Sequence, residues 1–370
     1  MPYAPYFVDG LQIGDYEIWS FYEKCDEKIK DQEVITNIKK ILSRHCRIKM
    51  GKKYEEEEIK NIYMISPQNY EFKEPFSEKQ REDIFKIRDI ISFCSISKSE
   101  SDQFFFEFSS NHFITHIQNI PGGMTNFDSI VIDDTFSTNE VYIDGVKFFE
   151  PLSIIPITEN SLSSDIDKNL LESFNKCFNE NNCEVIFSVL NLFYYVFYRE
   201  RIMDLKHKIL LLCMCFDVLL NCDGKKKFTK KICKIIQNEV EPIDDEYKPI
   251  LEKRSIEIDK SKSIKEITLN KTAWWAYDLY ELRSNIVHHN KLELDVKKNG
   301  NIRTILLFGT ILLKEIIIKK LIEKKFFEDT SIYELEFESF CYRRNLKRSL
   351  DSKLEIILKI QEEKLSLFGK

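Results

Sequence analysis

The strongest constraint on the fold is a succession of long apolar segments in the second half of the chain. "CEVIFSVLNLFYYVFYRE" (183–200) and "LKHKILLLCMCFDVLLNC" (205–222) are apolar on almost every side. Such segments fit helices surrounded by other helices, because a helix with a solvent face carries a polar stripe. The longest run is interrupted by Asp217 and is too short to span a bilayer. We therefore expect a helical bundle and no membrane partner.

Three further segments complete the predicted bundle. "KKFTKKICKIIQNEV" (226–240) is amphipathic with a basic outer face, and it is followed by "NKTAWWAYDLYELRSNIVHH" (270–289) and "NIRTILLFGTILLKEIIIKKLIEKK" (301–325). Apolar residues recur at helical spacing in each of them. The sequence predicts an all-α bundle of about five helices over residues 170–325. A helical extension is expected over 326–370.

Residues 1–165 show a mixed pattern instead. Amphipathic helices are expected over 26–45 and 77–93. Residues 103–117 and 128–149 are rich in β-branched and aromatic side chains, and the turn sequence "PGGMTNF" separates them. The predicted fold is an α+β N-terminal region followed by an all-α bundle, predominantly helical overall.

Charge and cysteine usage narrow the class of protein. Residues 1–165 hold 18 Lys and Arg against 29 Asp and Glu, whereas the remainder holds 37 against 32. The mildly basic second half is therefore the better candidate for a phosphate-bearing partner. The ten cysteines show no C-x-x-C spacing, and the start lacks a secretory signal pattern. We expect a reduced, cytoplasmic protein without a metal site or cofactor.

One polar stretch stands out at the end of the fourth bundle helix. In "YELRSNIVHHNKLEL" (280–294), Arg283 and His288 combine the two groups that metal-free RNA cleavage requires. Histidine titrates near neutrality and can take or give a proton, and the planar guanidinium suits a phosphate. Five helical positions place the two side chains about 140° apart around the axis. Either the helix ends near His288, or a second subunit supplies the missing half.

The segments around this stretch resemble the HEPN superfamily, and most closely its Apea-like branch. The resemblance is carried by "LYELRSNIVHH", by "KHKILLLCMCFDVLLN" with Asp217 near its end, and by "KKFTKKICKII". It covers about residues 180–325. Arg283 and His288 match the arginine and histidine of the family motif. Many members have Asn, Asp or His directly after the arginine, whereas this chain has Ser284, as Apea-like members commonly do.

The resemblance implies a function. HEPN nucleases cut RNA without a metal, as homodimers whose composite cleft is lined by the motifs of both subunits. The implied product carries a 2′,3′-cyclic phosphate, and the implied substrate is tRNA or other cellular RNA. The setting would be prokaryotic antiphage defence by abortive infection. Asn285, His289 and Asp217 are possible supporting residues. Residues 1–165 would be a sensor or regulatory domain that responds to a regulatory protein or a phage-derived trigger.

Other interpretations of these residues remain open. Arg283 could form a structural ion pair with Asp217 or Asp278, and the two histidines could simply favour the C-terminal end of the helix dipole. A run of lysines either steers phosphates or forms a solvated helix start; its members are Lys225, Lys226, Lys227, Lys230 and Lys231. The rival function is a non-catalytic HEPN module that binds RNA, a nucleotide or a protein partner. A metal-dependent nuclease in the N-terminal region would have to use Asp133 and Asp134.

Overall fold

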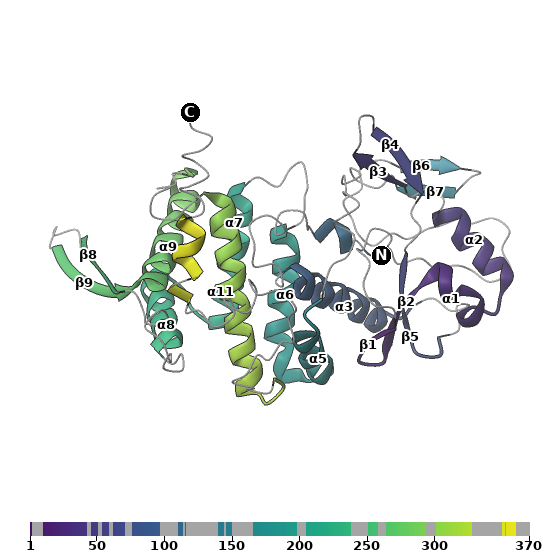
Figure 1. Ribbon diagram of the computed structural model, residues 1–370, viewed down its shortest axis with the longest axis horizontal. Helices are drawn as coiled ribbons and strands as arrows, with labels where there is room; N and C mark the ends of the chain where they lie inside the picture. The colour runs from purple at the N-terminus through teal and green to yellow at the C-terminus, as the bar shows by residue number, and fades with distance from the viewer. Residues whose placement is uncertain are drawn as a thin grey trace. The chain divides into compact units, whose positions relative to one another are not determined.

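A computed structural model gives the fold of the protein (Figure 1). It describes residues 1, 10–42, 46–50, 54–58, 62–70, 76–96, 110–113, 115, 140–143, 146–149, 166–197, 205–237, 251–257, 264–292, 301–327, 350–351 and 353–359. The described part of the chain is predominantly helical and carries small antiparallel sheets, as the sequence predicts at that coarse level. The described residues up to Phe197 belong to one compact unit and those from Leu205 onwards to a second.

The first unit begins with a small antiparallel sheet. Its strand order is β1-β2-β5, with bounds Leu11–Ile13, Tyr16–Ser20 and Tyr63–Pro67. Two helices follow β2 directly, α1 (Phe21–Lys28) and α2 (Gln32–Leu42). Apolar side chains from these elements form one core cluster: Trp19, Phe21, Cys25, Ile29, Val34, Ile35, Ile38 and Ile62. The sequence pattern predicts a single helix over 26–45, whereas the chain divides that region into α1 and α2.

Two separate hairpins belong to the same unit. β3 (Cys46–Met50) pairs with β4 (Tyr54–Glu58), and β6 (Glu140–Ile143) pairs with β7 (Val146–Phe149). The β6–β7 hairpin falls within the segment predicted to form strands. Residues 110–113, inside the other predicted strand segment, form the short 3₁₀ helix η1.

The long helix α3 (Glu78–Ile96) is the centre of the first unit. Ser77 and Gln80 cap its start reciprocally, each side chain accepting from the other residue's backbone amide. Every residue from 87 to 96 is buried, including Arg88 and Asp89. The Asp89 carboxylate pairs with Arg88 at 2.9 Å and accepts from the Asn191 amide at 2.9 Å. This pairing stabilises two buried charges that would otherwise be costly.

Three more helical segments complete the first unit. They are α5 (Lys168–Cys177), the 3₁₀ turn η3 (Asn181–Cys183) and α6 (Glu184–Phe197). Both α5 and α6 pack on α3. The sequence analysis places α5 and α6 in the bundle that starts near residue 170, whereas contacts group them with the N-terminal half. Their apolar faces are covered by α3, which the sequence pattern alone does not reveal.

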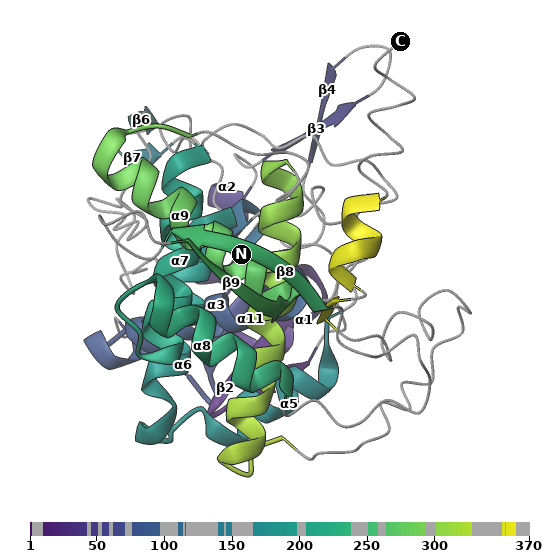
Figure 2. The same cartoon turned by 90° about the vertical axis from the view of Figure 1, so that its left-hand side faces the viewer.

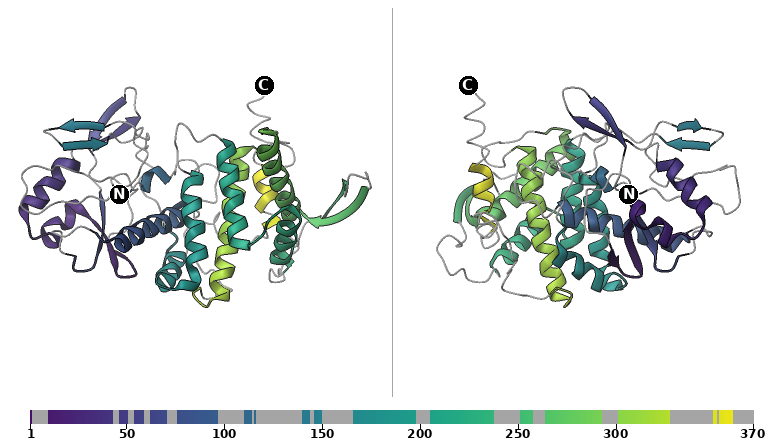
Figure 3. Two further views of the ribbon diagram at one scale, coloured as in Figure 1. Left: turned by 180° about the vertical axis from the view of Figure 1, so that it is seen from behind. Right: turned by 45° about the vertical axis from the view of Figure 1, so that its right-hand side comes forward.

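The second unit contains four helices that run through the predicted bundle region (Figures 1 and 3). They are α7 (Leu205–Leu220), α8 (Lys225–Gln237), α9 (Lys271–His289) and α11 (Ile302–Glu323). Contacts between aromatic rings join three of them. The ring centre of Phe228 in α8 lies 5.3 Å from that of Phe216 in α7 and 4.5 Å from that of Tyr280 in α9. Gly309 of α11 permits a close approach to α7, because a Cβ there would lie 2.6 Å from Leu212.

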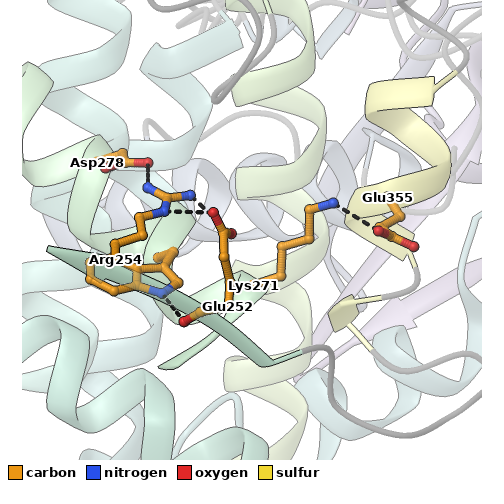
Figure 4. A network of polar contacts seen from close by, with 6 residues as sticks. Glu252, Arg254, Lys271, Asp278 and Glu355 are labelled. Atoms are coloured by element: carbon orange, nitrogen blue, oxygen red, sulfur yellow. Dashed lines mark hydrogen bonds and ion pairs between the residues drawn. The ribbon is translucent and has the colours of Figure 1, made fainter. Parts of the chain in front are cut away.

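A β-hairpin that the sequence analysis does not predict separates α8 from α9. β8 (Leu251–Glu257) and β9 (Ile264–Asn270) pair antiparallel and extend away from the helices, as Figures 1 and 2 show. Arg254 anchors the hairpin to α9 through Asp278 at 2.7 Å (Figure 4). The Trp274 indole donates to the Glu252 carbonyl at 2.8 Å. A two-stranded hairpin is marginal alone, so these contacts with α9 stabilise it.

The start of α9 is held by residues on both sides of it. Asn270 caps the helix by accepting from the Ala273 amide at 2.8 Å. The buried carboxylate of Asp351, from the C-terminal helical residues 350–359, accepts from the Thr272 amide at 2.7 Å and from its hydroxyl at 2.6 Å. Together they satisfy amides that have no partner inside the helix.

Asp351→Ala is expected to lower the free energy of unfolding of the second unit by about 2 kcal/mol, because it leaves the buried Thr272 donors unpaired. Urea unfolding followed by tryptophan fluorescence measures this in a Trp19→Phe background, since Trp274 and Trp275 are the remaining tryptophans. Glu355→Ala is the matched control. It removes an exposed ion pair with Lys271 (Figure 4) and should cost less than about 1 kcal/mol. Equal losses from the two variants would contradict the capping role of Asp351.

Candidate functional site

The two halves of α9 have different surroundings. Residues 272–280 are all buried except the half-buried Tyr277 and Asp278. From Ser284 to His289 only Ile286 is buried. The helix stops at Asn290, which adopts the left-handed conformation with φ 50° and donates to the Ile286 carbonyl at 3.0 Å. The bundle therefore holds the first half rigidly and presents the second half to solvent.

Arg283 lies where the buried half gives way to the exposed half. Its guanidinium is 3.5 Å from the Asp217 carboxylate of α7 and 5.5 Å from the centre of the Tyr280 ring. The Arg283 side chain is 36% exposed, so the ion pair with Asp217 does not remove it from solvent. Of the two carboxylates considered from the sequence, Asp217 is the partner, because Asp278 binds Arg254.

Burial changes the protonation chemistry around Asp217. Burial raises the pKa of the Asp217 carboxyl above its ordinary value, and nearby Arg283 opposes that shift only in part. The Cys222 thiol donates to Asp217 at 3.6 Å, and burial followed by the charge of Asp217 raises the Cys222 pKa to about 12. The thiol therefore stays protonated at neutral pH and acts as a donor to Asp217. Cys222 is a site residue that the sequence analysis does not single out.

The histidines lie at the last two positions of α9, and both are exposed. Their ring centres are 6.4 Å apart. Because α9 stays helical through His289, Arg283 and His288 leave the axis about 140° apart. One protomer therefore does not bring this pair together on one face. Ser284 lies one turn before His288 and is exposed, and Asn285 lies one turn before His289 and is half-buried.

The first turn of α7 lies against the end of α9. The Lys206 ammonium donates to the Asn290 carbonyl at 2.9 Å and to its side-chain oxygen at 2.8 Å. This contact places the exposed His207 at the same end of the second unit as His288 and His289. No sequence pattern links residues 206 and 290, so the position of His207 at this end of the second unit follows only from the packing of α7 on α9.

The lysine run at the start of α8 does not act as one group. Lys225 is 3.6 Å from Glu281 of α9, and Lys227 is 2.6 Å from Asp223. Lys231 donates to the carbonyls of Leu220 and Asn221 at the end of α7. Lys226 and Lys230 are exposed and form no ion pair with any described residue. Among the described residues, Lys226 and Lys230 thus have no ion-pair partner, whereas Lys225 and Lys231 contact other helices and Lys227 pairs across an exposed surface.

Exposed apolar side chains accompany the motif. Met214 and Val218 of α7 are 43% and 39% exposed, and Val287 of α9 is 56% exposed. Met214 and Val218 lie one turn apart on the same side of α7, and Val287 lies one turn after Arg283. Side chains of this kind favour contact with another apolar surface.

The structure describes only some of the residues on which the other interpretations of the sequence depend. Asp133 and Asp134 lie outside the described residues. Within the described ranges, no three His, Cys, Asp or Glu side chains gather as a metal ion would require. In the same part of the chain, no helix has the length and apolar character needed to cross a membrane. Comparisons with protein-family models, curated proteins and solved structures found no match.

Asp217→Asn tests the balance of burial and ion pairing at this carboxyl. A folded-state pKa above the ordinary value of 3.8 means that folding favours the protonated carboxyl. Its contribution to stability is therefore present below the pKa of the unfolded carboxyl and is lost as pH rises through the raised pKa. We expect Asp217→Asn to match or exceed the wild type at pH 7, with a difference below about 1 kcal/mol.

Urea unfolding from pH 3 to pH 8 measures this difference. The stability of the wild type relative to Asp217→Asn should decline as pH rises from about 3.8 through the raised pKa of Asp217. A variant that is clearly less stable than the wild type at pH 7, and equal to it at pH 3, would show that the ion pair outweighs burial.

Proposed function

We propose that the protein is a metal-independent endoribonuclease of the HEPN type that acts as a homodimer. The observation that carries this proposal is the pair Arg283 and His288 at the solvent-exposed end of an otherwise buried helix. A helix fixed at one end and open at the other can hold catalytic side chains steady while it leaves room for RNA.

In the proposed reaction, the 2′-oxygen of a ribose attacks the adjacent phosphorus and the bond to the 5′-oxygen breaks. His288 takes the proton from the 2′-hydroxyl, and a protonated group returns one to the leaving 5′-oxygen. Arg283 binds the phosphate as negative charge develops on its oxygens. The products are a 2′,3′-cyclic phosphate and a 5′-hydroxyl end.

A second copy of the chain has a defined role in this scheme. Arg283 and His288 leave one helix about 140° apart, so Arg283 of one protomer would work with a histidine from the other. The exposed Met214, Val218 and Val287 lie on the helices that carry Asp217 and Arg283, and they offer apolar area for pairing. A C2 arrangement would bring the two α9 ends together.

The wider setting of the proposal rests on the family resemblance. We propose tRNA or another cellular RNA as substrate, and antiphage defence by abortive infection in the cytoplasm as the role. The acidic residues 1–165 would act as the sensor that restrains the nuclease until a protein or phage-derived trigger arrives. Because α5 and α6 pack on α3, the deletion that tests this role removes the whole first unit, residues 1–199. It should increase cleavage if the unit restrains the nuclease, and unchanged cleavage would argue against that role.

A non-catalytic HEPN module that binds RNA, a nucleotide or a protein is the second candidate. The contact between Arg283 and Asp217 favours it, because a guanidinium held by a carboxylate also serves as a structural link. The two candidates differ in one respect: only the nuclease requires His288.

Cleavage of total tRNA and of a single-stranded RNA in EDTA tests the proposal. His288→Ala should lower the rate by about 10²–10⁴-fold, as expected for loss of a general base or acid. His207→Ala is the matched control, since it removes another exposed imidazole from the same end of the second unit. The wild-type product should carry cyclic-phosphate ends.

Three outcomes would contradict the proposed function or the residues assigned to it. Absence of cleavage by a folded dimer, with or without the first unit (residues 1–199), would favour the binding module. Cleavage only with a divalent metal would place the chemistry on other residues. Equal loss in His288→Ala and His207→Ala would remove the specific role of His288.

A further inference from the structure

Three of the exposed lysines of α8 form a single row along the helix. Lys226, Lys230 and Lys234 are exposed and follow one another at every fourth position of the helix. They form no ion pair with the described residues. Lys225, Lys227 and Lys231 are bound to Glu281, to Asp223 and to the last carbonyls of α7. We call Lys226, Lys230 and Lys234 the basic row.

The geometry of the basic row fits an extended chain of phosphates. Steps of four residues along a helix advance about 6 Å each, a spacing comparable to that of successive phosphates in an extended strand. The opposite side of α8 is fixed by buried Phe228 and Ile232, so the row cannot turn inward. The helix contains no Asp or Glu that would compete for the lysines.

The row starts beside the side of α9 that carries His288. Glu281, Ser284 and His288 follow one another at spacings of three and four residues, so they share one side of α9. Lys225, the residue just before the basic row, pairs with Glu281 and lies 4.0 Å from the centre of the Tyr277 ring. These contacts fix the N-terminus of α8 against the side of α9 that leads to His288.

We infer that the basic row binds the phosphates of single-stranded RNA on one flank of the bond aligned with Arg283 and His288. The assignment of the cleavage point rests on the proposed nuclease, whereas the binding of the strand does not. Each exposed lysine that neutralises a phosphate releases a counterion, which makes affinity depend on salt. A single strand can follow a straight row on one helix, while a duplex presents its phosphates along a groove.

The test measures binding of a fluorescent single-stranded RNA to the full-length chain at several salt concentrations. All proteins carry His288→Ala so that the RNA stays intact. Lys226→Ala with Lys230→Ala is compared with a charge-matched control, Lys176→Ala with Lys253→Ala. Both control lysines are exposed, and they lie outside α8, on α5 and β8.

The row variant should reduce the magnitude of the slope of log K against log salt by about 1.4, or about 0.7 for each lost phosphate contact. The control should leave the slope unchanged, and Lys234→Ala alone should reduce it by about 0.7. Duplex RNA of equal length should show no difference between the row variant and the control.

The outcomes separate this inference from the proposed nuclease. Equal slopes of log K against log salt for the row variant and the control would contradict the binding of RNA by the basic row, even if the wild type cleaves RNA. If the row variant had a smaller slope than the control with duplex RNA alone, the assignment of the row to single-stranded RNA would be wrong. Row-dependent binding of single strands in this test, together with no cleavage by the protein that retains His288, would support the row and contradict the nuclease.

Discussion

The burial of the first half of α9 is the constraint on which the second unit depends. Aromatic contacts to α8, the Asp278 bond to Arg254 and the Asp351 cap all act on residues 270–280. From Arg283 to His289 only Ile286 is buried, and polar contacts to Asp217 and Lys206 of α7 replace the close packing. A stable helix thus supports an exposed polar end, which is a suitable arrangement for a binding or catalytic site.

Charge pairing then decides which polar groups remain available for a ligand. Asp217 holds Arg283 in place without covering it, and its raised pKa shows that burial dominates over the ion pair. On α8, carboxylates and helix-end carbonyls occupy three lysines and leave the basic row exposed. Such exposed lysines retain strong hydration and contribute to binding chiefly by releasing counterions from a nucleic acid.

Several features of the fold are readable from the sequence because they rest on local patterns. The spacing of apolar residues predicts α3, α7, α8, α9 and α11 within a few residues of their bounds. The β8–β9 hairpin is missed because its strands carry several charged residues, and its anchors on α9 are distant in sequence. The grouping of α6 with α3 is missed because the two helices are distant in sequence, and an apolar helix pattern does not indicate which element the helix packs against.

The sequence by itself determines the candidate chemistry, since Arg283, His288 and the lysine-rich helix start are visible in it as residue types. It also determines the helical character of the second half. Only the tertiary structure decides that Arg283 pairs with Asp217 rather than Asp278, that Cys222 supports this carboxylate, and that Lys226 and Lys230 differ from their neighbours. The physical reason is that pairing and burial depend on long-range contacts between helices, which one-dimensional spacing does not encode.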